Sequence, residues 1–410
     1  MTIKTFFAGM AALALLLVNG CSARATPVME ETGVLELPYA VQSLAWHPDG
    51  RLLAVGYFMR DVVEVWDVHT KKPVFSVPST RRPVNLSGQE VLFSPDGKYL
   101  VVQDFLDTKD GAPKFPRRYE DPEELTAQQD KDRYILARVW DIEQHKEIAQ
   151  LKGPGSVVYG GAQDGFCWIA GGANQLAVHR KAIIQVHDMP SARLAFELNA
   201  SHPFADKPDQ RRGYWKMACH PTRPEVALEG AQLFKEAPQF GFPANSGATP
   251  IVVADLDRKA IKKVLFSPTP LNGVAYSADG SKLVSFGMSP SRVWDANRDF
   301  AALGEIENPP EWLWLNQRGM KVDMLHPPPN IPRGNAGELV FVAETDLMFG
   351  LSGDLYLWSL SEKRAIEHLP GFPDIFRISV HQPSLTFGVA EGRRVHFYQL
   401  NRSALSTSTK

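Results

Sequence analysis

The fold is decided by the repetition of one stretch, which reads WHPDGRLLAVGYFMRDVVEVWD from Trp46 to Asp67. In this stretch a turn signal, Pro48-Asp49-Gly50, precedes two apolar runs, and a Trp-Asp pair ends the second run. Period-two alternation with β-branched and aromatic residues, interrupted by Gly, Pro and Asp, is typical of short antiparallel strands. With its flanking residues the stretch predicts a four-stranded meander: Gln42–His47, Leu52–Tyr57, Val62–Val68 and Pro73–Val77.

The same order of turn, strands and terminal pair returns about seven times, at a spacing of roughly 40–60 residues, which is the range of propeller blades. The later copies end in Trp140-Asp141, His187-Asp188, Ala254-Asp255, Trp294-Asp295, Trp358-Ser359 and Phe397-Tyr398-Gln399. One such meander cannot bury both of its faces, and radial packing around a shared axis solves this problem. We expect each Trp to fit between neighbouring blades and each following Asp to accept backbone hydrogen bonds in the next turn.

The last copy lacks an outer strand, because only a polar, Ser/Thr-rich tail follows Leu400. An unassigned strand, Gly33–Pro38, lies before the first copy, and we expect it to pair with Val395–Leu400. Such pairing removes the two unpaired sheet edges of an open array. The sequence therefore predicts an all-β fold: a seven-bladed β-propeller of four-stranded antiparallel blades, closed by an N-terminal strand that completes the last blade.

With these motifs the chain resembles the WD-repeat propeller family, over nearly everything from Gly33 to Leu400. The Trp-Asp pairs carry the resemblance, together with the His-Pro or Ser-Pro that precedes Asp-Gly. The Gly-His pair that usually opens a eukaryotic WD repeat is absent from every copy. Bacterial quinoprotein-like and lactonase-like propellers therefore remain neighbouring possibilities.

The N-terminal residues predict export. Lys4 precedes an apolar run, Phe6–Val18, that is too short to span a bilayer comfortably. The run ends in Asn19-Gly20-Cys21-Ser22, which resembles the lipobox of bacterial lipoproteins, where the Cys is acylated and becomes the mature N-terminus. The alternative is a soluble export signal that is cut after Ala23-Arg24-Ala25.

These features predict four segments: a signal peptide over residues 1–21, a flexible tether over 22–32, the propeller over 33–400 and a disordered tail over 401–410. We expect the protein to be lipid-anchored through Cys21 in the bacterial cell envelope, facing the periplasm, or else soluble in the periplasm. Cys167 and Cys219 could pair in an exported protein. We place them at opposite ends of neighbouring strands, too far apart for a disulfide, and expect two small buried side chains.

Long insertions predict a binding face. The links from the second strand of a blade to the third, and from one blade to the next, open on the same face, and loops on a rigid support commonly carry binding sites. A short helix is expected after Asp121-Pro122 in one insertion. The predicted partner-binding residues of these insertions are Arg117, Arg118, Leu233, Phe234, Phe240, Phe242, Trp312 and Trp314. The alternative is that the loops only cover the channel or the rim.

Catalytic motifs are not recognisable in the sequence. His47, His220 and His326 each precede a Pro in equivalent turns, and His381 is a near match, so we interpret all four as structural. Four acids could form a metal site at the channel mouth, although nothing singles them out: Asp104, Asp164, Glu229 and Asp346. We predict no catalytic residue, no metal and no cofactor. The net charge of -2 does not indicate a basic surface for nucleic-acid binding.

Three functions remain compatible with the sequence. The favoured one is a non-enzymatic protein-binding scaffold, monomeric and attached to the membrane only through its N-terminal lipid, whose loops bind another exported or envelope protein. The second is a channel-mouth enzyme, either a metal-dependent lactonase or a quinone-cofactor dehydrogenase. The third is a module that binds carbohydrate or cell wall.

Overall fold

The computed structural model describes residues 28–57, 60, 62–78, 90–107, 134–153, 165–170, 174–180, 183–200, 217–230, 241, 248–267, 271–287, 291–306, 340–342, 347–351, 355–360, 364–369 and 375–401. The chain divides into a main unit, Glu31–Gln399, and a small unit that comprises Met1–Glu30 and Leu400–Lys410. In the described part of the small unit, the Asn401 N–H donates to the Val28 carbonyl oxygen at 2.9 Å. No helix in the described ranges is long and apolar enough to cross a membrane.

The described residues form seven four-stranded sheets, and the blades are antiparallel, as the sequence predicted. The first blade contains β2 (Val41–Trp46), β3 (Leu52–Tyr57), β4 (Val62–Asp67) and β5 (Lys72–Pro78), and the second contains β6 (Val91–Phe93), β7 (Tyr99–Asp107), β8 (Tyr134–Asp141) and β9 (Lys146–Gly153). The third contains β10 (Phe166–Ile169), β11 (Gln175–Arg180), β12 (Ile183–Asp188) and β13 (Arg193–Asn199), and the fourth contains β14 (Met217–Cys219), β15 (Glu225–Glu229), β16 (Thr249–Asp255) and β17 (Ala260–Ser267). The fifth contains β18 (Leu271–Tyr276), β19 (Lys282–Gly287), β20 (Ser291–Asp295) and β21 (Ala301–Ile306), and the sixth contains β22 (Val340–Phe341), β23 (Leu347–Leu351), β24 (Leu355–Ser359) and β25 (Arg364–Leu369).

The remaining sheet joins the two ends of the propeller sequence. It contains β26 (Ile375–His381), β27 (Thr386–Glu391), β28 (Arg394–Leu400) and, as its outer strand, β1 (Met29–Glu36). The Leu37 N–H donates to the Arg393 carbonyl oxygen at 2.8 Å, and the Thr32 hydroxyl donates to the Phe397 carbonyl oxygen at 3.2 Å. The segment expected to pair with Val395–Leu400 thus lies beside it, and its strand begins at Met29 rather than at Gly33.

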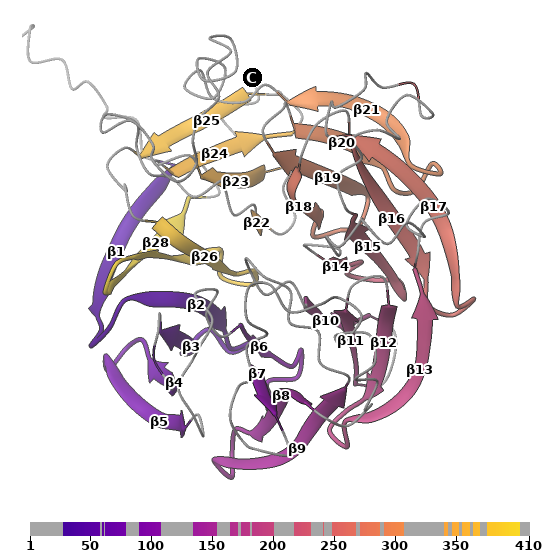
Figure 1. The fold of residues 1–410 in the computed structure, drawn as a ribbon. Coiled ribbons are helices and arrows are strands. Elements are labelled where there is room, and N and C mark those ends of the chain that lie inside the picture. The colour runs from indigo at the N-terminus through magenta and orange to yellow at the C-terminus, as the bar shows by residue number, and fades with distance from the viewer. Residues whose placement is uncertain are drawn as a thin grey trace, which may run out of the picture. The chain divides into compact units, whose positions relative to one another are not determined.

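The blades of the main unit follow one another around a ring, with the first strand of each blade innermost (Figure 1). The innermost strands contact their neighbours: β2 contacts β6 and β26, β14 contacts β10 and β18, and β22 contacts β18 and β26. The apolar core lies between blades, as clusters that each combine two consecutive sheets. The main unit is therefore an all-β propeller.

The Trp-Asp pairs occupy the predicted places. Trp66 packs with Ala390 and Val395 of the last blade, and Trp140 packs with Ala45 and Val65 of the first. A β-bulge precedes the Trp in each of these blades, where the register of the third and fourth strands shifts. In the first blade, Asp67 accepts hydrogen bonds from the backbone N–H groups of residues 69 and 70. Both predictions for the pair are confirmed.

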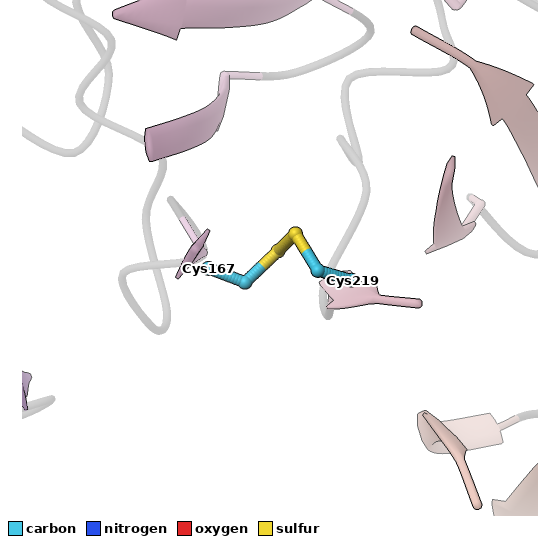
Figure 2. Close-up of a disulfide and its surroundings, with 2 residues drawn as sticks. All are labelled: Cys167 and Cys219. Atoms are coloured by element: carbon cyan, nitrogen blue, oxygen red, sulfur yellow. A yellow bond between two sulfur atoms is a disulfide. The ribbon is translucent and has the colours of Figure 1, made fainter. Parts of the chain in front are cut away.

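A disulfide joins Cys167 and Cys219, with a Cα–Cα distance of 5.7 Å (Figure 2). The expectation of two unpaired cysteines was therefore wrong. Both strands are short, since β10 has four residues and β14 has three. Strands of that length measure only about 10–13 Å, so their opposite ends are close together. Because these two innermost strands contact each other across the third and fourth blades, the disulfide fastens one blade to the next.

Candidate functional site

The connections of the propeller define two faces. We call the side with the links from second to third strands and from blade to blade the loop face. The other side, which carries the hairpins between first and second and between third and fourth strands, is the turn face. The predicted partner-binding residues fall in residues 108–133, 231–240, 242–247 and 307–339 on the loop-face links, outside the described residues. Also outside the described residues are Cys21, Asp164, His326, Asp346 and the helix expected after Asp121.

The described part of the loop face contains an exposed aromatic-guanidinium pair. Tyr39 lies in the link from β1 to β2, and Arg60 lies in the link from β3 to β4. The Arg60 Cζ atom is 4.3 Å from the centre of the Tyr39 ring, a distance typical of a cation–π contact. Tyr39 is 37% exposed and is the one aromatic residue among the exposed large hydrophobic residues of the described chain. We call this pair the Tyr39–Arg60 patch.

Polar groups on the buried side of Tyr39 hold the Tyr39–Arg60 patch in place. The Tyr39 ring packs edge-on against Tyr57, with 5.6 Å between the ring centres. The Tyr57 hydroxyl donates to Glu64 Oε2 at 2.5 Å, and Trp66 Nε1 donates to the same carboxylate at 3.0 Å. Burial, followed by the hydrogen bond to Glu64, raises the pKa of Tyr57 far above its ordinary range. Tyr57 therefore stays a neutral hydrogen-bond donor, which fixes the ring against which Tyr39 rests.

Tyr39 and Arg60 are not among the contact residues that the sequence predicts. Neither residue belongs to a motif, and they lie 21 positions apart in two different links. The Pro38-Tyr39 pair after the N-terminal strand was the one available signal, and it needed the placement of β1 to become informative. An exposed Tyr with an Arg stacked on it is a combination enriched in protein interfaces. This patch can pack against a partner and donate hydrogen bonds to it.

The turn face carries a repeated junction between blades. His47 Nε2 lies 2.8 Å from the Gly97 carbonyl oxygen of the next blade, and His220 Nε2 lies 2.9 Å from the Gly280 carbonyl oxygen. His381 Nε2 makes the corresponding bond to the Pro48 carbonyl oxygen at 2.9 Å, between the last blade and the first. The interpretation of these three His residues as structural is confirmed.

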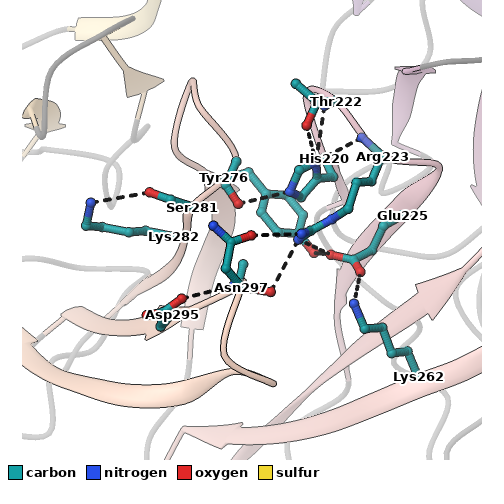
Figure 3. A network of polar contacts seen from close by, with 12 residues as sticks. His220, Thr222, Arg223, Glu225, Lys262, Tyr276, Ser281, Lys282, Asp295 and Asn297 are labelled. Atoms are coloured by element: carbon teal, nitrogen blue, oxygen red, sulfur yellow. Dashed lines mark hydrogen bonds and ion pairs between the residues drawn. The ribbon is translucent and has the colours of Figure 1, made fainter.

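The junction of the fourth and fifth blades carries a network of polar contacts (Figure 3). Glu225 is only 4% exposed, and it accepts from the Tyr276 hydroxyl at 2.9 Å and from Lys262 Nζ at 2.5 Å. Arg223 bridges the blades, because its guanidinium donates to Asn297 Oδ1 at 2.9 Å and lies 3.4 Å from Glu225. Burial and Glu225 raise the pKa of Tyr276 well above its ordinary range. This network joins blades rather than exposing a reactive group.

Of the four acids considered for a metal site, Asp164 and Asp346 lie outside the described residues. Glu229 lies at the end of β15 and is buried, and Asp104 lies within β7. Among the described residues, no group of three or more His, Cys, Asp and Glu side chains is arranged to hold a metal ion.

Residues 35–91 match the family model of the anaphase-promoting complex subunit 4 WD40 domain. This range covers the end of β1, the whole first blade and the start of the second. No curated protein matches the chain. The local match and the four-stranded antiparallel blades together support a WD-repeat-like β-propeller.

Proposed function

We propose that this protein is a non-enzymatic scaffold of the bacterial cell envelope, which binds another exported protein through the loop face of its propeller. The observation that carries the proposal is the Tyr39–Arg60 patch, an exposed aromatic-guanidinium pair on a rigid, buried support. The predicted contacts at Arg117, Phe234 and Trp312 belong to links on the same face. A partner that covers the patch and these loops would gain a contact large enough for specific binding.

Two features support export and anchoring. The Cys167–Cys219 disulfide is of the kind that persists in oxidising compartments such as the periplasm. The apolar run that ends at Gly20-Cys21 has the form of a lipoprotein signal. We propose that Cys21 is acylated and holds the protein on the membrane, with the propeller in the periplasm.

Affinity capture from detergent-solubilised envelope tests the binding proposal. We expect the intact protein to retain a partner that the double variant Tyr39→Ala, Arg60→Ala loses at least tenfold. The matched control is Leu303→Ala, which removes another exposed large side chain, from the outer strand β21. Equal capture by the double variant and the control would refute the patch as the contact.

A second variant tests the long insertion of the fourth blade. Residues 232–247 are replaced by a short Gly/Ser linker, which keeps β16 intact because that strand begins at Thr249. We expect this variant, which lacks Leu233, Phe234, Phe240 and Phe242, to lose the partner while it keeps its disulfide and its unfolding midpoint. Point variants at the remaining predicted contacts then show how much each loop contributes to partner binding: Arg117→Glu, Arg118→Glu, Trp312→Ala and Trp314→Ala.

The anchor has its own test. Cys21→Ala should move the protein from the membrane fraction to the soluble fraction, or block its maturation. A Cys21→Ala protein that matures and stays in the membrane fraction would show that acylation is not the anchor.

A further inference from the structure

The turn face presents its cations outward and its carboxylates inward. Arg258 and Arg298 have side chains 84% and 83% exposed, whereas their partners Asp255 and Asp295 are 25% and 20% exposed. The carboxylates are recessed because they accept backbone N–H groups of their own turns, as Asp67 does. The same arrangement recurs in two more blades, in the pairs Arg51–Asp67 and Arg193–Asp188.

The described turns carry more exposed cations than exposed acids. Nine Lys or Arg side chains are exposed on them: Arg51, Lys71, Lys72, Lys98, Lys146, Arg193, Arg258, Lys259 and Arg298. Six acids are exposed on the same turns: Asp49, Asp96, Glu143, Asp257, Asp279 and Asp299. Because most of the paired carboxylates lie deeper than their cations, a flat surface that approaches the turn face meets positive charge first.

Both ends of the main unit lie at this face. Gln399, near the end of β28, donates through Nε2 to the Ser384 carbonyl oxygen in the hairpin of the last blade, which is on the turn face. β1 runs antiparallel to β28, because Leu37 pairs with Arg393 and Thr32 pairs with Phe397. The main unit therefore begins, at Glu31, on the turn face.

The short connection to Cys21 limits how the propeller can stand on a membrane. Ten residues lead from Cys21 to Glu31, and such a segment reaches at most about 35 Å when fully extended. A blade strand of six to eight residues is itself roughly 20–25 Å long. To place the loop face on the membrane, the connection would have to run along a whole blade and pass the insertions of that face.

We infer that the turn face is a membrane-docking surface, held by its exposed Arg and Lys residues against anionic phospholipid headgroups. This inference rests on the proposed acylation of Cys21 and deepens it, because it assigns a direction to the anchored propeller. The loop face with the Tyr39–Arg60 patch then points away from the membrane, toward the partner. Cationic residues near an anionic leaflet are attracted over about one Debye length, so close approach of the turn face is required.

Depth-dependent fluorescence quenching in vesicles tests the orientation. The full acylated protein is reconstituted into phosphatidylcholine vesicles that contain phosphatidylglycerol and headgroup-labelled quencher lipid. A fluorophore is attached at Lys98→Cys on the turn face or, as the matched control, at Arg393→Cys, an exposed residue in the link from β27 to β28 on the loop face. We expect the Lys98 position to be quenched at least threefold more strongly. Equal quenching, or stronger quenching at position 393, would overturn the inference.

The contribution of charge is tested in the same protein. The triple variant Arg193→Gln, Arg258→Gln, Arg298→Gln should lose most of the difference in quenching, and 0.5 M salt should abolish it in the wild type. The control triple variant Lys152→Gln, Arg393→Gln, Arg394→Gln removes as many exposed cations from a loop-face link and from strand ends beside that face, and should keep the difference. A control variant that loses as much as the test variant would refute recognition by the turn face.

The two proposals fail in different ways. If Cys21→Ala leaves the mature protein on the membrane, the anchor is wrong, whatever the orientation. If acylated protein is anchored but shows no preference between the two labelled positions, the anchor stands and the docking surface alone is refuted.

Discussion

At the scale of single residues, the propeller depends on glycines that allow a His from the neighbouring blade to approach. Gly50, Gly97 and Gly280 all have positive φ angles, and each faces the His of the preceding blade. A Cβ atom added at Gly280 would lie 2.2 Å from His220 Cε1. The turn glycine and the His therefore depend on each other for close packing, although they belong to different blades.

Replacement of Gly280 by Ala should lower the free energy of unfolding by about 2–5 kcal/mol. Part of this cost is the left-handed backbone, about 1–2 kcal/mol, and the rest is the displacement of His220. The matched control is Gly392→Ala, because Gly392 also has a positive φ but has no atom within 4 Å of an added Cβ. Urea unfolding of both variants separates the two terms, and equal losses would show that the contact with His220 costs nothing.

His220 should also make stability depend on pH. Its Nδ1 accepts from the N–H of Arg223 at 3.0 Å while Nε2 faces the Gly280 carbonyl oxygen, an arrangement that needs neutral imidazole. Burial, with the positive charge of Arg223 nearby, lowers the pKa of His220 below its ordinary value of 6.5. Between the folded pKa and 6.5 the unfolded chain binds more protons, so the free energy of unfolding falls as the pH drops below about 6.5.

The His220→Gln variant should be less stable than the wild type at pH 8, by about 1–3 kcal/mol, because a buried bond between blades is lost. It should also lose a smaller part of its remaining stability between pH 8 and pH 5.5. His69→Gln, an exposed turn residue of the first blade, provides the control and should keep the wild-type pH dependence. An unchanged slope in His220→Gln would show that His220 does not contribute to it.

At the scale of elements, neighbouring innermost strands are held together by more than apolar contacts. β10 and β14 belong to consecutive blades and carry the two cysteines of the disulfide. The cross-link closes a segment with a sequence separation of 52, which includes most of the third blade. Such a constraint acts mainly on the unfolded chain, whose entropy it reduces.

Cys167→Ser should therefore lower the free energy of unfolding by about 4 kcal/mol relative to the oxidised wild type, as the loop length implies. Wild-type protein unfolded in the presence of a reductant should show the same loss, while the reductant should not affect the Cys167→Ser, Cys219→Ser double variant. A wild-type midpoint that does not respond to the reductant would contradict the contribution of the disulfide.

At the scale of the whole main unit, the ring is held by a sheet that draws strands from both ends of the sequence. Leu35 of β1 is buried in one cluster with Trp66 of the first blade and Phe397 of the last. An interaction at this point stabilises the first and last blades at once, because each buries its apolar surface against the other.

Leu35→Ala should cost about 2–5 kcal/mol and lower the midpoint of the main unfolding transition. Leu303→Ala, on the outer strand β21 and 45% exposed, should change stability by no more than about 0.5 kcal/mol. Tryptophan fluorescence and far-UV circular dichroism should report the same midpoint for Leu35→Ala. A separate early transition would instead show that the last blade unfolds by itself.

The sequence by itself determined the structural features that depend on residues only a few positions apart in the chain. Alternation and turn chemistry predicted the strands, the Trp between blades and the hydrogen bonds of Asp67, because strand period and hairpin geometry are local properties. The repeated order of these pieces predicted the blades, and the leftover strand near Gly33 predicted a partner in β28.

Only the tertiary structure decided which side chains from different blades meet. Cys167 and Cys219 pair because two very short innermost strands of consecutive blades lie side by side, so that opposite strand ends are close together. Tyr39 and Arg60 form a patch because separate links open on one face. Glu225 is buried among Arg223, Lys262 and Tyr276 because two blades close over it. Such contacts depend on the distance between blades, which packing sets and no local pattern encodes.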